Sequence, residues 1–266
     1  MGKKTSLPVK LKYELYEASV QEADVDVNFF ATAYEEQCGG KKALDIREDF
    51  CGTHWLCCEW IKSDPKRTAV GIDLSDEPLE YGRQVHEATL SKEEKTRLKT
   101  IKQNVKEVTK QKFDIVVASN FSYFIFKQRS ELLDYFKSVR ASIKSSGLFV
   151  FDHFGGPGSA DVGKEKRNVK VDKKKYKYIW HAERANLFTA EALFHIHFQE
   201  KESKKMYEKA FSYDWRMWTV PELRDIALEA GFKKITIYKD IDGEYTQKDF
   251  NEEDDDSWLL QIVAHP

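Results

Sequence analysis

Short apolar runs alternate with longer helical patterns through the first 150 residues of the chain. The runs that are expected to form strands cover residues 43–46, 68–72, 98–101, 113–118 and 147–151. The helical patterns, with apolar residues three or four positions apart, cover residues 53–62, 75–88 and 131–143. Strands that alternate with helices are typical of βαβ units, so the pattern predicts a mostly parallel sheet with helices on both faces.

The pattern changes after residue 155. Three segments then alternate apolar and polar side chains, which is typical of an antiparallel sheet with one buried face. They cover residues 176–183, 192–200 and 206–213. Thr219 and Glu222 have the spacing of a capping box, in which both side chains bond the backbone at a helix start. Two final strands are expected at residues 234–239 and 258–264.

Composition narrows the class of protein. Of the 266 residues, 41% are hydrophobic and 33% are charged, which supports a sizeable core under a well-solvated surface. No apolar run approaches the roughly 18 residues of a membrane span, and the first residues lack the apolar stretch of a secretory signal. The four cysteines have neither disulfide nor zinc-site spacing, which favours free thiols in a reducing compartment. We therefore expect a cytoplasmic protein with no membrane partner.

The net charge of -2 conceals two opposed segments. Residues 164–177 carry eight basic and two acidic side chains, whereas residues 249–256 carry six acidic side chains and no basic one. We expect both segments on loops that flank the insertion and the last hairpin, close enough to pair across the substrate entrance. The alternative is that each segment is a separate solvated loop.

Polar residues follow each of the five predicted parallel strands. In chain order they are Glu48, Asp73, Asn104, Asn120 and Asp152. An open α/β sheet binds its ligand outside the carboxyl ends of its strands, where the strand order reverses. We therefore expect the ligand site among these side chains.

The spacing of these residues indicates a nucleoside. Asp73 follows Gly52 by about 20 residues, the separation at which a carboxylate can accept hydrogen bonds from ribose hydroxyls. Asn104 suits either an adenine edge or a simple turn. A pyrophosphate needs several glycines in the first turn, but here only Gly52 is present, and the chain has no Walker A sequence. A nucleoside without phosphates is the better match, and a nicotinamide dehydrogenase is a distant alternative.

Several short runs resemble, in their order, the motifs of class I S-adenosylmethionine-dependent methyltransferases. They are LDIREDFCGT at 44–53, GID at 71–73, FDIVV at 113–117, NFSY at 120–123 and GLFVFD at 147–152. The resemblance extends over roughly residues 11–266 and is closest to small-molecule enzymes with an antiparallel insertion before the last helix. It implies a Rossmann-like, seven-stranded, mostly parallel sheet, S-adenosyl-L-methionine as cofactor, and methyl transfer to a small-molecule acceptor by in-line displacement.

The resemblance also divides the chain into four parts. We expect an N-terminal helical cap, a Rossmann-like cofactor-binding core, an antiparallel β insertion or lid, and a C-terminal helix with two strands that complete the core. These parts cover residues 1–40, 41–154, 155–215 and 216–266.

The cofactor-binding residues are likewise implied by the resemblance. Glu48 matches the acidic residue of the first strand, Asp73 the ribose-binding acid, and Asn104 the residue at the adenine edge. Tyr16 lies in a segment that resembles the helix over the methionine end of the cofactor, although that segment also suits a helix packed on the core. The implied set is Tyr16, Glu48, Phe50, Gly52, Thr53, Asp73, Leu74, Asn104, Val105 and Asn120.

One departure from the family pattern concerns the glycine-rich turn. Phe50 and His54 stand where the family usually has glycines, so the path of this loop is expected to differ. Asp45 competes with Glu48 for the acidic role if the first strand is short.

Candidate catalytic residues follow the fourth and fifth strands. Methyl transfer from a sulfonium depends mainly on alignment in a water-poor site, with a base only when the nucleophile arrives protonated. Tyr123, Asp152 and His153 are the candidates, and His153 is the candidate general base because an unperturbed histidine titrates near neutral pH. Structural roles remain open, because a histidine at a strand end is often only hydrogen-bonded and an aspartate before Gly155 can form a turn.

The end of the antiparallel segment carries candidate substrate residues. Tyr213, Trp215 and Arg216 combine aromatic and charged side chains that suit a small polar or aromatic molecule. His195 and His197 alternate along one strand, but without a third ligand a solvent-facing strand is favoured and we expect no metal site.

Other functions share the same cofactor residues. An RNA methyltransferase would use a basic surface, for which residues 164–177 are the only candidate segment. A protein methyltransferase or a non-catalytic S-adenosylmethionine-binding module is a further alternative. We expect a small-molecule substrate, no nucleic-acid partner, and a monomer or homodimer.

Overall fold

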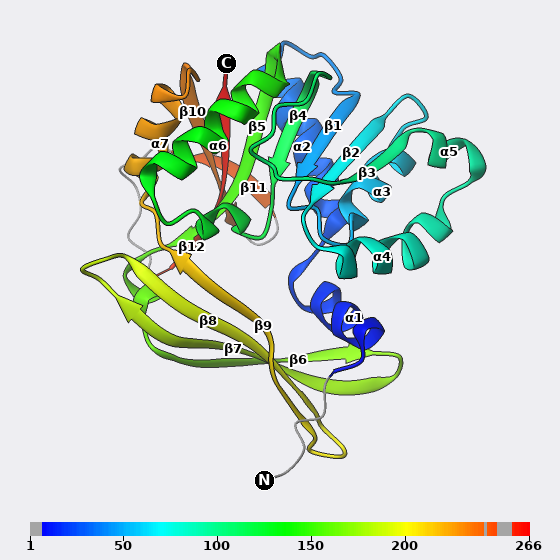
Figure 1. The fold of residues 1–266 in the computed structure, drawn as a ribbon, viewed down its shortest axis with the longest axis vertical. Helices are drawn as coiled ribbons and strands as arrows, with labels where there is room; N and C mark the ends of the chain where they lie inside the picture. Colours follow the sequence, from blue (N-terminus) through cyan, green and yellow to red (C-terminus); the bar gives the residue numbers. More distant parts are fainter. Residues whose placement is uncertain (1–6, 242–243, 249–256) are drawn as a thin grey trace.

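The computed structural model describes residues 7–241, 244–248 and 257–266 of the chain. Twelve strands within these residues form two sheets, and seven α-helices pack around them (Figure 1). Within the same residues, no helix has both the length and the apolar character needed to cross a membrane.

The larger sheet has eight strands in the order β11-β10-β12-β5-β4-β1-β2-β3. Its parallel part consists of β1 (Asp45–Asp49), β2 (Thr68–Asp73), β3 (Leu98–Lys102), β4 (Phe113–Ala118) and β5 (Ile143–Gly155). The antiparallel part consists of β10 (Lys234–Ile241), β11 (Glu244–Lys248) and β12 (Trp258–His265). The sequence pattern predicts seven of these strands; β11, which pairs with β10, is the additional one.

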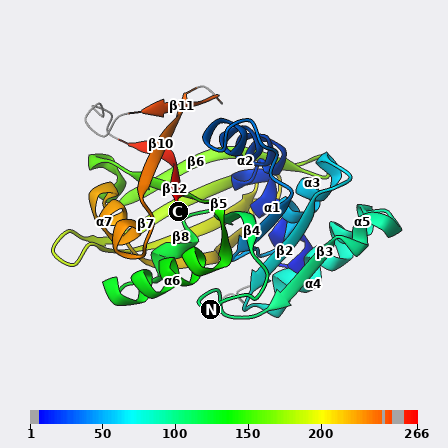
Figure 2. The same ribbon diagram turned by 90° about the horizontal axis from the view of Figure 1, so that it is seen from above.

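Helices cover both faces of this sheet, as predicted. The helices α2 (Ala23–Gln37) and α3 (Trp55–Ser63) pack on one face, against Ile46 and Ile115, whose side chains are fully buried. The helices α6 (Arg129–Ser142) and α7 (Val220–Glu229) pack on the other (Figure 2). The strand order reverses between β1 and β4, so the loops that follow these two strands border the crevice in which such sheets bind ligands.

Five shorter elements lie between residues 76 and 160 of the chain. They are α4 (Asp76–Val85), η1 (Glu87–Thr89), α5 (Lys92–Thr96), η2 (Ser122–Ile125) and η3 (Pro157–Ala160). The predicted capping box of Thr219 and Glu222 is present at the start of α7, and a second one, formed by Ser91 and Glu94, begins α5. These polar pairs satisfy backbone N–H groups that would otherwise lack partners at the helix starts.

The smaller sheet, here called sheet B, is antiparallel and covers one end of the larger sheet. It consists of β6 (Gly163–Val171), β7 (Lys174–Asn186), β8 (Glu191–Glu200) and β9 (Met206–Arg216), paired in chain order. Helix α1 (Val9–Val20) packs on its inner face, where Leu15 meets buried side chains such as Tyr178 and Phe198. Sheet B and α1 therefore lie across the end at which the parallel strands finish (Figure 1).

Two sequence-based expectations about sheet B are wrong. The basic residues 164–177 form β6, a two-residue turn and the start of β7 rather than a loop, and most side chains of β6 stay exposed to water although the strand pairs with β7. His195 and His197 do lie opposite the apolar face of β8, but only 3% and 7% of their surfaces are exposed. Neighbouring groups cover them, including the His181 ring 3.1 Å from His197 Nε2. The acidic residues 249–256 lie outside the described residues.

Candidate active site

The turn after β1 is the centre of the candidate site. Phe50, Gly52 and His54 all have left-handed backbone conformations, with φ between 44° and 57°. A glycine adopts this conformation without strain, whereas the other two positions must be stabilised by their surroundings. The turn is fastened to β2 because Cys51 N–H donates to the Ile72 carbonyl and Gly52 N–H donates to Asp73 Oδ2.

Asp73 ends β2 with its carboxylate directed at this turn. Oδ2 accepts from Gly52 N–H at 2.9 Å, and Oδ1 accepts from Ser75 N–H at 2.8 Å. Each oxygen keeps a further lone pair, so the carboxylate can still accept bonds from a pair of ribose hydroxyls. The Ser75 side chain forms no capping bond, although Ser75 precedes the first residue of α4. Leu74, beside Asp73, is 60% exposed and leaves an apolar surface next to the carboxylate.

Glu48 lies one residue before the end of β1 and is buried. Its Oε2 accepts a hydrogen bond from Cys57 Sγ of α3 at 3.0 Å. Burial raises the pKa of Glu48 to about 8, and the nearby carboxylates of Asp73 and Asp26 add to the rise. Desolvation and like charges both disfavour the ionised form, and no lysine or arginine among the described residues forms an ion pair with this side chain.

Two further carboxyl groups belong to the same region. Burial raises the pKa of Asp152 on β5 to about 7, and burial with the charges of Glu22 and Asp24 raises that of Asp26 on α2 to about 7. Asp26 adds to the rise at both Asp152 and Glu48, so the three groups share one electrostatic environment. We call Asp26, Glu48 and Asp152 the acidic cluster.

The loop after β3 has a rigid backbone. Asn104 Oδ1 accepts from Lys106 N–H, and the Asn104 carbonyl accepts from Glu107 N–H, each at 3.0 Å. Gln103 N–H donates to the Asp73 carbonyl, which ties the loop to the end of β2. Within the described part of the chain no residue accepts a hydrogen bond from Val105 N–H. Asn104 therefore does form a turn, and its NH₂ group and the Val105 N–H remain available.

Asp152 determines the path of the loop after β4. Its two carboxylate oxygens accept from Asn120 N–H at 2.6 Å and from Phe121 N–H at 2.8 Å. Both of these residues are left-handed, with φ of 58° and 55°. Two consecutive non-glycine residues in this conformation cost free energy, and the charge-assisted hydrogen bonds offset that cost.

Tyr123 and His153 lie together in the core. Tyr123 OH is 3.0 Å from His153 Nδ1, and neither side chain is more than 1% exposed. Burial lowers the pKa of His153 to about 3. Such a weak base is poorly matched to proton removal near neutral pH, so the geometry favours a supporting role for this pair.

Aromatic side chains of α1 and sheet B face the strand ends. The rings of Tyr16 and Phe211 are 4.6 Å apart, and those of Tyr213 and Trp215 stack at 4.4 Å. Tyr16 hydrogen-bonds Tyr213, and the charge of Asp152 acts on Tyr16, which brings α1, β9 and β5 together. Burial is the main cause that raises the pKa of Tyr16, so its hydroxyl remains a donor at neutral pH.

The other predicted substrate residues have partners inside the protein. Trp215 is 3% exposed and belongs to the core. Arg216 donates to the Lys127 carbonyl, pairs with Glu222 at 3.1 Å and covers the Trp218 ring at 3.7 Å. Of the three, Tyr213 is the one that the structure brings next to Tyr16.

A buried carboxylate attaches α1 to the turn. Glu17 Oε1 accepts from Thr53 Oγ1 and lies next to His86 Nε2, both at 2.7 Å, and its other oxygen is 3.4 Å from Tyr81 OH. The Thr53 hydroxyl is therefore bonded to α1. Helix α1 is held over the strand ends by this polar contact as well as by apolar packing on sheet B.

Sequence reasoning missed four charged residues of this region: Asp26, which is half-buried, and Glu17, Arg47 and Asp49, which are buried. The last two carried a signal, since Arg-Glu-Asp falls within a strand whose neighbours are apolar, and charged residues are rarely buried unless they are paired. Asp26 and Glu17 lie on helices with mixed composition, where only the tertiary packing reveals burial.

Comparisons with known proteins identify the fold. No known family profile and no curated protein sequence matches the chain. Among solved structures, an S-adenosylmethionine-dependent methyltransferase from Clostridium acetobutylicum has a TM-score of 0.67 at 15% identity, over 95% of this chain and 94% of that one. The CcbJ methyltransferase from Streptomyces caelestis scores 0.68 at 15% identity, over 91% and 94%.

A third solved structure is an S-adenosylmethionine-bound amino pentose methyltransferase from Micromonospora echinaspora. It scores 0.69 at 12% identity, and 99% of each chain is covered. At these identities the likeness concerns the fold, and it confirms the predicted Rossmann-like sheet with its antiparallel addition. The chain therefore has the fold of solved S-adenosylmethionine-dependent methyltransferases.

Proposed function

We propose that the protein transfers a methyl group from S-adenosyl-L-methionine to a small-molecule acceptor. The observation that carries the proposal is a set of four carboxylates: Glu48, Asp73 and Asp152 on strands of the larger sheet, and Asp26 on α2. Within the described residues, no lysine or arginine side chain pairs with any of the four. Glu48 is buried and the other three are half-buried, and carboxylates withdrawn from water without a protein cation favour a cationic ligand.

S-adenosylmethionine has the complementary chemistry. Its sulfonium and ammonium groups are positive and would lie near the acidic cluster, while its ribose hydroxyls would reach Asp73. Adenine presents an acceptor at N1 and a donor at its amino group, which suit the Val105 N–H and the remaining lone pair of Asn104 Oδ1. When bound, the cofactor supplies an electrophilic methyl group on sulfur.

The protein's own residues would orient the acceptor and exclude water. We assign the acceptor side to Tyr16 and Tyr213, which face the strand ends from α1 and β9. Asp152 would set the position of Asn120 at the same edge through its two backbone hydrogen bonds. Alignment of this kind supplies much of the rate enhancement of a one-step displacement.

A small molecule is favoured over RNA as the acceptor. Lys164, Lys166 and Lys170 of β6 pair in register with His181, Ile179 and Lys175, whereas the residues that meet α1 occupy the alternate positions of β7. These three lysine side chains therefore lie on the face of sheet B turned away from the strand ends, whereas Arg167 lies on the inner face, over the Tyr178 ring. The solved relatives with this fold include a sugar N-methyltransferase from Streptoalloteichus.

Cellular location and assembly are part of the proposal. The four cysteines are free, as expected for a reducing compartment. We infer a cytoplasmic enzyme, monomeric or homodimeric, that needs neither a membrane nor a nucleic acid. Light scattering coupled to size-exclusion chromatography tests the assembly, and a larger oligomer would contradict it.

Calorimetry tests the cofactor. The wild-type protein should bind S-adenosylmethionine and not NAD, and Asp73→Ala should weaken binding at least tenfold because two ribose hydroxyls lose their acceptor. Asp76→Ala is the matched control, since Asp76 is an exposed carboxylate on α4 that pairs with Lys102. Failure of the wild-type protein to bind, or unchanged binding by Asp73→Ala, would refute the proposed cofactor.

A second experiment addresses the acceptor. Cofactor with a labelled methyl group is incubated with the protein and a cell extract, and the extract is separated into small molecules, RNA and protein. Label in the small-molecule fraction supports the proposal. Label confined to RNA or protein would overturn the assignment of the acceptor while leaving the cofactor intact.

A further inference from the structure

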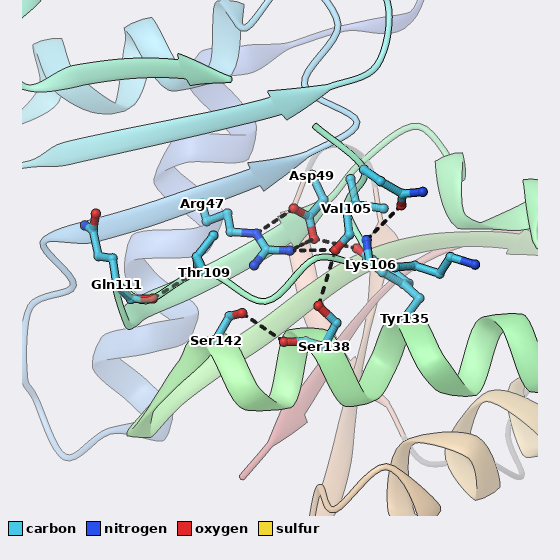
Figure 3. Close-up of polar contacts among 10 residues, drawn as sticks. Arg47, Asp49, Val105, Lys106, Thr109, Gln111, Tyr135, Ser138 and Ser142 are labelled. Carbon is cyan, nitrogen blue, oxygen red and sulfur yellow. Dashed lines mark hydrogen bonds and ion pairs between the residues drawn. The ribbon is translucent and has the colours of Figure 1, made fainter. Parts of the chain in front are cut away.

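Arg47 is a fully buried arginine in the middle of the larger sheet. Its Nε donates to Asp49 Oδ1 at 2.7 Å, and its Nη2 donates both to Asp49 Oδ2 and to the Val105 carbonyl at 3.0 Å (Figure 3). One side chain of β1 therefore joins the end of its own strand to the loop that follows β3.

The partners of Arg47 are fixed by α6. Tyr135 OH donates to Asp49 Oδ2 at 2.9 Å, and Ser138 Oγ lies 3.4 Å from the Val105 carbonyl as a second donor (Figure 3). Every side chain in this group is buried. The Val105 carbonyl is thus held from the β1 side and from the α6 side.

Stability alone does not explain this arrangement. Burying an ion pair costs desolvation, and apolar residues of similar size are often as stable or more so. Arg47 Nη1 is also buried and has no hydrogen-bond partner within the described residues, which adds a further cost. What an apolar pair cannot do is hold the Val105 carbonyl at a defined place.

The position of the Val105 carbonyl also determines where the neighbouring hydrogen-bonding groups lie. Val105 N–H and the Asn104 side chain belong to the same short turn, which hydrogen bonds to Asp73 and Glu107 secure at its two ends. We propose that Arg47 is a positioning residue for adenine recognition: the Arg47 and Asp49 pair holds the loop so that Val105 N–H and Asn104 face the edge of the base. This inference rests on the proposed function.

The test compares two ligands that differ only at this edge. S-adenosylhomocysteine has a ring acceptor at N1 and an amino donor, whereas S-inosylhomocysteine has a ring donor and a carbonyl acceptor in their place. A loop that is held in position should prefer the first ligand strongly, since the second leaves its donor and acceptor unpaired. The measured quantity is the ratio of the two dissociation constants.

Arg47→Lys keeps the positive charge next to Asp49 but cannot reach both Asp49 oxygens and the Val105 carbonyl. The double variant Arg47→Met with Asp49→Leu removes both charges and leaves neither one unpaired. In both variants we expect cooperative unfolding to be retained and the ratio of dissociation constants to fall about tenfold, the equivalent of about one hydrogen bond.

Two serines of α6 distinguish the positioning of the Val105 carbonyl from a general effect on protein stability. Ser138→Ala removes a donor to the Val105 carbonyl and should lower the ratio. Ser142→Ala removes an equally buried hydroxyl one turn later on α6, which bonds only the Ser138 carbonyl, and should leave the ratio unchanged. The inference is wrong if a folded Arg47 variant keeps the wild-type ratio, or if Ser142→Ala lowers it as much as Ser138→Ala does.

A different binding result is expected if the proposed function itself is wrong. In that case the wild-type protein binds neither S-adenosylmethionine nor S-adenosylhomocysteine. If the wild-type protein binds both and the ratio is insensitive to Arg47, only the positioning role is lost.

Discussion

Replacing Asp26 with asparagine should stabilise the ligand-free protein and weaken its binding of S-adenosylmethionine. In the ligand-free protein the carboxylate is partly buried near like charges, and no cation pairs with it within the described residues. Removing its charge therefore relieves desolvation and repulsion. The same change removes an attraction for a cationic ligand, so stability and affinity should move in opposite directions.

The size of the stability gain follows from the pKa. Burial and neighbouring acids raise the pKa of Asp26 from its ordinary value of 3.8 to about 7. A rise of that size equals at most about 4 kcal/mol, and relaxation around the charge lowers the expected gain to about 1–2 kcal/mol. For a chain of this length the gain corresponds to an increase in Tm of about 2–6 °C.

The gain should depend on pH with a definite sign. Because the pKa is higher in the folded protein, the wild-type carboxylate destabilises the fold increasingly as the pH rises from about 4 to about 7, and fully above that range. The advantage of Asp26→Asn should be largest at pH 8 and shrink as the pH falls to 5. Chemical denaturation at several pH values measures it.

Calorimetry at pH 8 measures the loss of affinity. A buried carboxylate and a nearby cation attract each other by on the order of 1–2 kcal/mol, so the dissociation constant should rise about tenfold. Asp24→Asn is the control, because Asp24 lies in the same helical turn but is exposed. A loss of stability in the variant would refute the electrostatic argument for the ligand-free protein. A gain in stability with wild-type affinity would show that Asp26 does not act on the cofactor.

Three other predictions concern the turn and the acidic cluster. Thr53→Val removes a donor to the buried Glu17 carboxylate and should lower the free energy of unfolding by about 1–2 kcal/mol in denaturant titrations; an unchanged value would mean that α1 is held without this bond. Gly82→Ala places a methyl group against the Thr53 carbonyl and should cost about 3 kcal/mol by thermal unfolding, whereas Gly163→Ala, with open space around it, should cost little. Between pH 6 and pH 7, a carboxyl group with a pKa of about 7 changes from about a tenth to half ionised, so the dissociation constant for S-adenosylmethionine should fall about fivefold; a rise would contradict the role of the acidic cluster.

The sequence predicts the parallel part of the fold well because its signal is local. Strands such as β4 are apolar at most positions, since both faces are covered by helices. The same reasoning misses β11, whose sequence Glu-Tyr-Thr-Gln-Lys contains a single large apolar residue, and it interprets β6 as a loop because lysines recur along this strand. Strands at sheet edges depend on pairing that no local pattern reveals.

The candidate site could be predicted only in part. Glu48 and Asp73 follow from their places at strand ends, because parallel topology brings those ends together. Arg47 and Asp26 are charged, and residues of that kind are usually exposed, so their burial could not be inferred without knowing what packs on them. His153 is the reverse case: its chemistry suggests a base, and only the tertiary structure reveals that it is buried beside Tyr123.

The lysines of β6 also affect how the protein behaves at high concentration. β6 is an edge strand of sheet B, and an exposed edge offers free peptide groups to a strand of another molecule. Lys164, Lys166 and Lys170 are exposed along this edge, so pairing two copies through it would bring rows of like charge together. The segment that was the candidate nucleic-acid surface in the sequence thus places charge repulsion where edge-to-edge pairing of two copies would otherwise be favourable.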